Sequence, residues 1–217
     1  MRNLQLAVAF LPLLMSAPAA AVSITVADPT GDILPSFVGT GSADLDVTSF
    51  SVSLDPSATT FALGAVLAGD INPALAGFYV IGVNTGAGAI RPFAGIGEPN
   101  VTFDQVIIVQ KNGTATVGGT SLTTLLSGNQ FIVSVPLSLL PSTGATPQNY
   151  GFNIWPREGA VVTNNSQITD FAPNNALLAV NGVFVPEPAS WLMMLLGFGL
   201  IGGMMRFRRG RPLAQVA

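Results

Sequence analysis

Apolar and polar residues alternate along several short segments in the middle of the chain. In residues 47–54, Phe50 and Val52 share one face of an extended chain, and residues 61–67 alternate in the same way. A period of two residues is typical of a β-strand with one buried face. Residues 55–58, Asp-Pro-Ser-Ala, favour a turn between the two runs. The pattern therefore predicts two successive antiparallel strands.

Eight further segments are short, apolar and bounded by turn-forming residues, and we predict that they are strands: 24–27, 78–83, 101–110, 114–117, 131–135, 150–155, 160–163 and 176–180. Residues 106–109 are apolar throughout, which indicates burial on both faces. Asn112-Gly113 favours a type I′ hairpin turn. Short helices are expected only within residues 121–126 and 136–140.

The spacing of these segments predicts an all-β fold, an antiparallel β-sandwich of the jelly-roll-like kind. They all lie within residues 22–185, which are long enough to form one domain with a sizeable core. This body contains ten acidic residues and three basic ones. Because nucleic-acid binding depends on phosphate neutralisation by Lys and Arg, nucleic acid is not expected as a partner.

The chain contains neither histidine nor cysteine. This composition excludes Ser-His-Asp and Cys-His nucleophile systems and imidazole metal centres. A glycosidase-like carboxylate pair would have to use Asp104 or Glu158. The aromatic residues available to stack on sugar rings are Trp155, Tyr150 and Tyr79. They alternate along the chain as core residues of a sandwich do. We therefore predict a non-enzymatic protein, with a carbohydrate- or calcium-binding module as the alternative.

Four aspartates lie close together near the start of the body: Asp28, Asp32, Asp44 and Asp46. The first two belong to an Asp-x-x-Gly-Asp turn that loosely resembles the opening of certain secreted bacterial β-sandwich domains. Converging carboxylates are what Ca²⁺ requires, and Asp170 would add another if the terminal strands are neighbours. The other interpretation is that these aspartates cap turns and strand starts, in which case no cofactor is expected.

The N-terminus has the features of a secretory signal. Arg2 precedes the apolar residues 4–15, and the alanine run that includes Ala19 and Ala21 offers a small-x-small cleavage site. We predict that residues 1–21 are a signal peptide, recognised by the secretion translocon and removed after Ala21.

The C-terminus has three parts in a fixed order. Pro186, Glu187 and Pro188 form a triplet that proline geometry keeps extended. Residues 189–205 then carry no charge and would span about 25 Å as a helix, close to the thickness of a bilayer core. Trp191 is placed for one membrane interface. A basic cluster follows within residues 206–211 and predicts a cytoplasmic C-terminus: Arg206, Arg208, Arg209 and Arg211.

This tail, residues 186–211, resembles the PEP-CTERM signal of exported bacterial proteins. The resemblance implies processing by an exosortase, a membrane protease-transpeptidase that removes the helix and passes the protein to the cell surface or extracellular matrix. It also implies an inner-membrane-anchored precursor and an association with exopolysaccharide and biofilm. We therefore expect an exported surface protein whose membrane anchor is temporary.

Overall fold

A computed structural model of the chain describes residues 21–57, 59–161 and 163–181. The chain divides into two compact units, residues 1–182 and 183–217, and all described residues belong to the first. The predicted signal peptide, apart from Ala21, and the whole predicted sorting tail lie outside the described residues. Within the described ranges, no helix is long and apolar enough to cross a membrane.

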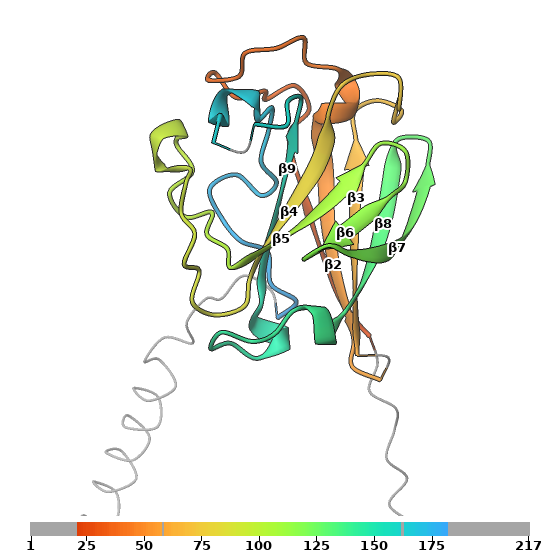
Figure 1. Cartoon of the computed structure of the whole chain (residues 1–217), viewed down its shortest axis with the longest axis vertical. Coiled ribbons are helices and arrows are strands. Elements are labelled where there is room, and N and C mark those ends of the chain that lie inside the picture. Colours follow the sequence, from red (N-terminus) through yellow and green to blue (C-terminus); the bar gives the residue numbers. More distant parts are fainter. Residues whose placement is uncertain (1–20, 58, 162, 182–217) are drawn as a thin grey trace, which may run out of the picture. The chain divides into compact units, whose positions relative to one another are not determined.

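In the described part of the chain, nine strands form one antiparallel sheet in the order β1-β2-β3-β8-β7-β6-β5-β4-β9 (Figure 1). Their bounds are Val22–Ala27 (β1), Val47–Asp55 (β2), Thr60–Leu67 (β3), Phe78–Asn84 (β4), Gln105–Gln110 (β5), Ala115–Val117 (β6), Thr120–Ser127 (β7), Gln130–Pro136 (β8) and Gly151–Arg157 (β9). The other elements that the described residues form are short 3-10 turns: Ala43–Leu45 (η1), Ala94–Ile96 (η2), Leu137–Leu139 (η3), Pro147–Asn149 (η4) and Asn165–Gln167 (η5). The all-β, antiparallel prediction is confirmed.

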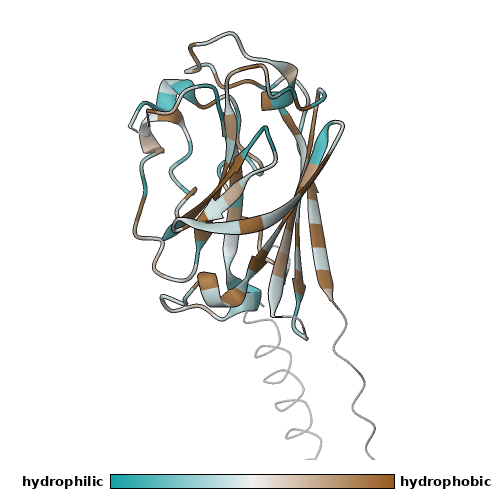
Figure 2. Cartoon of the chain, turned by 45° about the vertical axis from the view of Figure 1, so that its right-hand side comes forward, coloured by the Kyte–Doolittle hydropathy of each residue, from teal (hydrophilic) through white to brown (hydrophobic). Residues whose placement is uncertain are grey.

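The sheet is curled, so that β2, β3 and β8 face β4, β5 and β9 across a common core (Figure 1). Apolar and polar residues alternate along several strands, as Figure 2 shows, and in β2 and β8 the buried apolar residues belong to this core. Phe61 on β3 packs against Phe152 on β9, and Tyr79 on β4 against Phe131 on β8, each with ring centroids 4.9 Å apart. The strands thus form one continuous sheet with facing halves, and the sandwich architecture stays a prediction.

The outer face of β4, β5 and β9 carries a second apolar cluster. Ile107 and Val109 of β5 are buried in the main core, whereas Val106 packs, half-buried, against the second cluster. Trp155 contacts Phe93 and Phe103 there, at centroid distances of 5.0 and 5.1 Å. The expected burial of residues 106–109 is therefore complete on the inner face and partial on the outer face.

The helix expected within residues 121–126 is wrong. These residues belong to β7, which pairs with β6 and β8. Leu122 and Leu126 pack partly buried against the core, while Leu125 is 69% exposed on the other side. Alternation with a period of two explains this strand. The expected helix within residues 136–140 is present as the single 3-10 turn η3.

The hairpin between β5 and β6 is confirmed, but its predicted turn type is wrong. A type I′ turn needs positive φ at both central residues, and here only Gly113 has one, at +88°. The amide of Gly113 donates to the carbonyl of Gln110, and the amide of Gln110 donates to that of Thr114. Gly113 therefore follows the turn, and Lys111 occupies its first central position.

The segment after β9 follows the outer edge of that strand without forming a regular strand. Isolated bridges join Ile168 to Arg157, Ala172 to Ile154, and Leu178 to Phe152. Residues 176–180 are thus represented by one bridge, and the described residues of 160–163 contain no strand, so both predicted strands are wrong. This edge segment carries Asp170.

Candidate functional site

The turn after β1 contains two of the predicted aspartates, Asp28 and Asp32. The amide of Asp28 donates to the carbonyl of Thr48 at 2.9 Å, which fixes the end of β1 beside β2. Gly31 has a φ of +84°, a backbone conformation that residues with a side chain rarely adopt. It lies in the turn directly before Asp32. The Gly31 amide donates to the Oδ2 atom of Asp46 at 2.8 Å. The turn is therefore held directly against the start of β2.

Asp170 reaches the same place from the opposite end of the domain. It is fully buried, its Oδ2 accepts from the amide of Val47 at 2.9 Å, and its Oδ1 accepts from the amide of Phe171 at 2.7 Å. The neighbouring Thr169 hydroxyl donates to the carbonyl of Leu45 at 2.6 Å. These contacts attach the edge segment after β9 to the start of β2.

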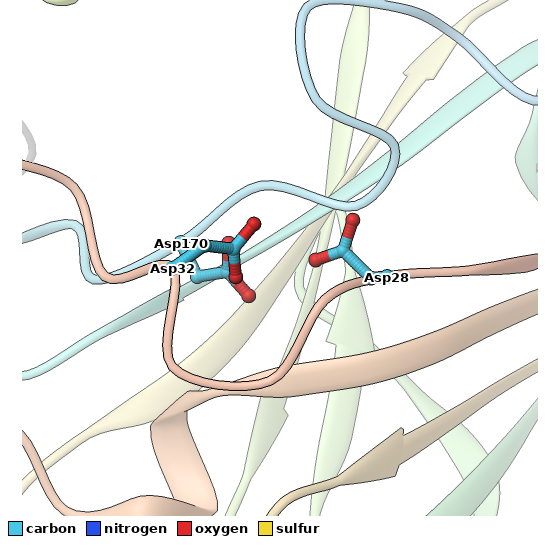
Figure 3. Close-up of side chains that lie close together, drawn as sticks. All are labelled: Asp28, Asp32 and Asp170. Carbon is cyan, nitrogen blue, oxygen red and sulfur yellow. The ribbon is translucent and has the colours of Figure 1, made fainter.

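Carboxylate oxygens of Asp28, Asp32 and Asp170 lie within 4.8 Å of one another. Figure 3 shows the Asp28 carboxylate facing those of Asp32 and Asp170 across the turn. The amide side chain of Asn174 donates to Asp32 Oδ2 at 3.1 Å. Three carboxylates from two distant parts of the sequence thus share one small space.

Several oxygens in this cluster are buried without a hydrogen-bond partner: Asp28 Oδ2, Asp32 Oδ1 and Asp46 Oδ1. Burial, reinforced by the charges of Asp32 and Asp46, raises the pKa of Asp28 to about 7. Burial also raises the pKa of Asp170 to about 8, with a further contribution from Asp28. The cluster therefore accumulates negative charge as these groups ionise.

Glu98 is a further acidic neighbour of the cluster. It is 7% exposed, its charge acts on Asp28, and burial raises its own pKa. The amide of Asn175 donates to Glu98 Oε2, and the amide of Asn100 donates to the Asn175 side chain. The loop between β4 and β5 is thereby connected to the edge segment that carries Asp170.

The structure places three of the four predicted aspartates together and the fourth elsewhere. Asp28, Asp32 and Asp46 surround the turn, whereas Asp44 pairs with Lys111 at 2.8 Å. Asp170 was expected only if the chain ends met, and sequence reasoning missed Glu98. No local motif marks Glu98, because it lies far along the chain from the turn that it approaches.

A comparison with protein-family models identifies the C-terminal segment. The model described as the PEP-CTERM protein-sorting motif matches residues 184–209. This chain carries a PEP-CTERM sorting signal. The match covers the Pro186-Glu187-Pro188 triplet and three of the four predicted arginines, and it confirms the PEP-CTERM resemblance. No curated protein and no solved structure matches the chain.

Asp104 and Glu158, the two candidates for acid–base chemistry, accept hydrogen bonds that hold neighbouring loops in place. Although burial opposes the shift, hydrogen bonds from Ala89, Thr143 and Thr85 lower the pKa of Asp104 to about 2. Hydrogen bonds from Gly41 and Thr40 lower the pKa of Glu158. Both groups are therefore carboxylates near neutral pH and lack the raised pKa of a general acid.

The aromatic residues considered for sugar stacking are core residues, as predicted. Trp155 and Tyr150 are each 2% exposed and Tyr79 is fully buried. A cavity of about 600 Å³ lies beside Trp155, and its wall is mainly apolar, formed by residues of β4, β5 and β9 and by the loop that contains Phe93. The described part of the chain therefore offers no exposed aromatic platform at these three positions.

Proposed function

We propose that this protein is made as an inner-membrane-anchored precursor, processed by an exosortase, and delivered to the cell surface or the extracellular matrix. The observation that carries the proposal is the match of residues 184–209 to the PEP-CTERM sorting motif. That motif marks an exported exosortase substrate. The delivery site, the role in an exopolysaccharide matrix and the absence of enzymatic activity are the further parts of the proposal.

The position of the described core supports processing at the tail. Its buried apolar residues run from Leu45 to Val180, before the Pro186-Glu187-Pro188 triplet. Removal of the tail after the triplet would therefore leave this core intact. At the other end, β1 begins at Val22, so cleavage after Ala21 would leave the first strand complete.

Replacing Pro186-Glu187-Pro188 by Ala-Ala-Ala tests the proposal. Residues 189–205 and the arginines are unchanged, so the variant should still be exported and inserted but should accumulate as the larger precursor. Ser190→Ala, a single change inside the matched segment, is the control and should be processed normally. The readouts are immunoblots of membrane and surface fractions, together with mass spectrometry of the surface form.

Peptides covering residues 191–206 should be absent from the wild-type surface protein. Recovery of an intact tail on that protein, with normal sorting of the Ala-Ala-Ala variant, would show that the triplet is not read by a processing enzyme.

A further inference from the structure

The aspartate cluster is notable for a buried oxygen that nothing in the described protein satisfies. Asp46 is 6% exposed, and its Oδ2 is held by the amide of Gly31 within the turn between Asp28 and Asp32. Its other oxygen, Oδ1, is buried and has no hydrogen-bond partner. Buried polar atoms are nearly always paired, because desolvating an unpaired carboxylate oxygen is costly. The Asp46 oxygen beside the turn is therefore available to a further partner, such as a cation or a water molecule.

We propose that Asp28, Asp32 and Asp170 form a binding site for Ca²⁺, with Asp46 as an acidic neighbour. The proposal concerns the ectodomain alone and is independent of the sorting signal. It replaces Asp44 of the sequence-based prediction with Asp170, because Asp44 already has Lys111 as its partner.

The spacing of the carboxylates suits this ion. Ca²⁺ binds oxygen ligands at about 2.3–2.6 Å, so oxygens on opposite sides of the ion are about 5 Å apart. One oxygen each from Asp28, Asp32 and Asp170 lies within 4.8 Å of the other two. One ion can therefore contact all three side chains, and the nearby charge of Asp46 adds to the negative potential there.

The ligand chemistry excludes softer metals. The cluster offers carboxylate oxygens, and the chain has no histidine or cysteine to supply nitrogen or sulfur. Oxygen-only sites suit hard cations such as Ca²⁺ and Mg²⁺. Mg²⁺ demands shorter bonds and near-ideal octahedral geometry, whereas Ca²⁺ accepts irregular carboxylate sets such as this one.

Binding at this position would join two segments that are far apart in the sequence, beside the start of β2. Asp28 and Asp32 follow β1, Asp46 lies between η1 and β2, and Asp170 lies on the edge segment after β9. Without the ion, Asp170 is attached to this region through the amide of Val47, and Asn174 through Asp32. The cation would therefore act as a cross-link between the first strands and the last segment of the domain.

Thermal unfolding of the full chain, purified in mild detergent and treated with chelator, tests the site. An ion that binds only the native state should raise the unfolding midpoint by about 3–6 °C for each tenfold increase in free Ca²⁺ above its Kd. No change between chelator and about 10 mM Ca²⁺ would overturn the proposal, since extracellular sites bind at about 0.1–1 mM. A shift of equal size with Mg²⁺ would overturn the assignment to Ca²⁺.

Two variants separate ion binding from an ordinary structural role. Asp28→Asn and Asp32→Asn should abolish the Ca²⁺-dependent shift, yet in chelator each should be at least as stable as the wild type because a repelling charge is removed. Asp70→Asn, a matched change at an exposed site, should keep the full shift. Loss of stability in chelator together with a retained shift in Ca²⁺ would show that these aspartates only cap the turn.

Discussion

Lys111 and Asp44 form an ion pair of 2.8 Å in which the side chains are only 3% and 2% exposed. Lys111 also donates to the carbonyl of Ala76 at 2.8 Å, while Asp44 accepts from Ser42 and from the amide of Asn72. The Asp44 carboxylate therefore has its own partners, although Asp44 is only two residues from Asp46 in the chain. The pair ties the β5–β6 turn to η1 and withdraws Asp44 from the aspartate cluster.

We predict that Lys111→Met destabilises the protein by about 3–5 kcal/mol, because it leaves the buried Asp44 carboxylate without its cation. Urea unfolding measures this difference. The double variant Lys111→Met/Asp44→Asn should recover much of the loss, since asparagine keeps an acceptor for the Asn72 amide without a charge. A single variant within about 1 kcal/mol of wild type would show that the pair contributes no more than a surface ion pair does.

Strands could be predicted from the sequence where a local pattern decides them, and not where pairing with distant strands does. The strands that alternate clearly, such as Val47–Asp55 and Thr60–Leu67, were predictable because the period of two is a local property. Residues 121–126 were not, since Leu122, Leu125 and Leu126 also fit helical spacing, and pairing with β6 and β8 decides the outcome.

The cluster divides in the same way. Asp28 and Asp32 share a recognisable turn, so their proximity was visible in the sequence. Asp170 and Glu98 join them only through the path of the edge segment and of the β4–β5 loop. The loss of Asp44 depends on Lys111, which a turn between β5 and β6 places beside it. Contacts between residues so far apart along the chain leave no pattern in a single sequence.

The aspartate cluster predicts an unusual dependence of stability on pH in the presence of chelator. Asp28 and Asp170 have pKa values of about 7 and 8, above the ordinary value of 3.8. The folded state therefore binds these protons more tightly than the unfolded state, so stability should fall as pH rises from about 4 to about 8. The charges of Asp32, Asp46 and Glu98 act in the same direction.

Midpoints of thermal unfolding between about pH 5 and about pH 8 would measure this loss, expected to be on the order of a few kcal/mol. Asp28→Asn is the control and should reduce the slope, leaving the part that Asp170 contributes. A stability that is constant or rises across this interval in chelator would contradict the prediction.

Gly82 on β4 lies directly under the ring of Trp155. A Cβ atom at this position would come within 2.5 Å of two ring carbons, and Trp155 is only 2% exposed and packed between Phe93 and Phe103. We predict that Gly82→Ala destabilises the protein by about 1–3 kcal/mol through overpacking. Denaturant unfolding checks this value.

The matched control for Gly82→Ala is Gly95→Ala, whose added Cβ meets no atom within 4 Å. It should leave stability nearly unchanged. Adding Trp155→Leu to Gly82→Ala should cost less than the sum of the two single changes, because the smaller side chain removes the clash. Strict additivity would show that the ring and the glycine are not coupled.

Asp104 connects the loops at one end of β4 and β5. Its Oδ2 accepts from the amide of Thr85 at 2.9 Å and from the hydroxyl of Thr143 at 2.8 Å, and its Oδ1 accepts from the amide of Ala89 at 2.9 Å. Asp104→Asn replaces one acceptor oxygen by a donor that faces another donor. We predict a loss of about 1–3 kcal/mol, measured by denaturant unfolding at neutral pH.

The change in stability at acid pH provides the sharper test of the hydrogen bonds to Asp104. Because the pKa of Asp104 is lowered to about 2, its contribution is fully present above the ordinary value of 3.8 and is lost as pH falls toward 2. Wild type should therefore lose stability relative to Asp104→Asn in this interval, and the two should converge near pH 2. A difference between wild type and Asp104→Asn that stays constant down to about pH 2 would show that the Asp104 carboxylate is not held by these three donors.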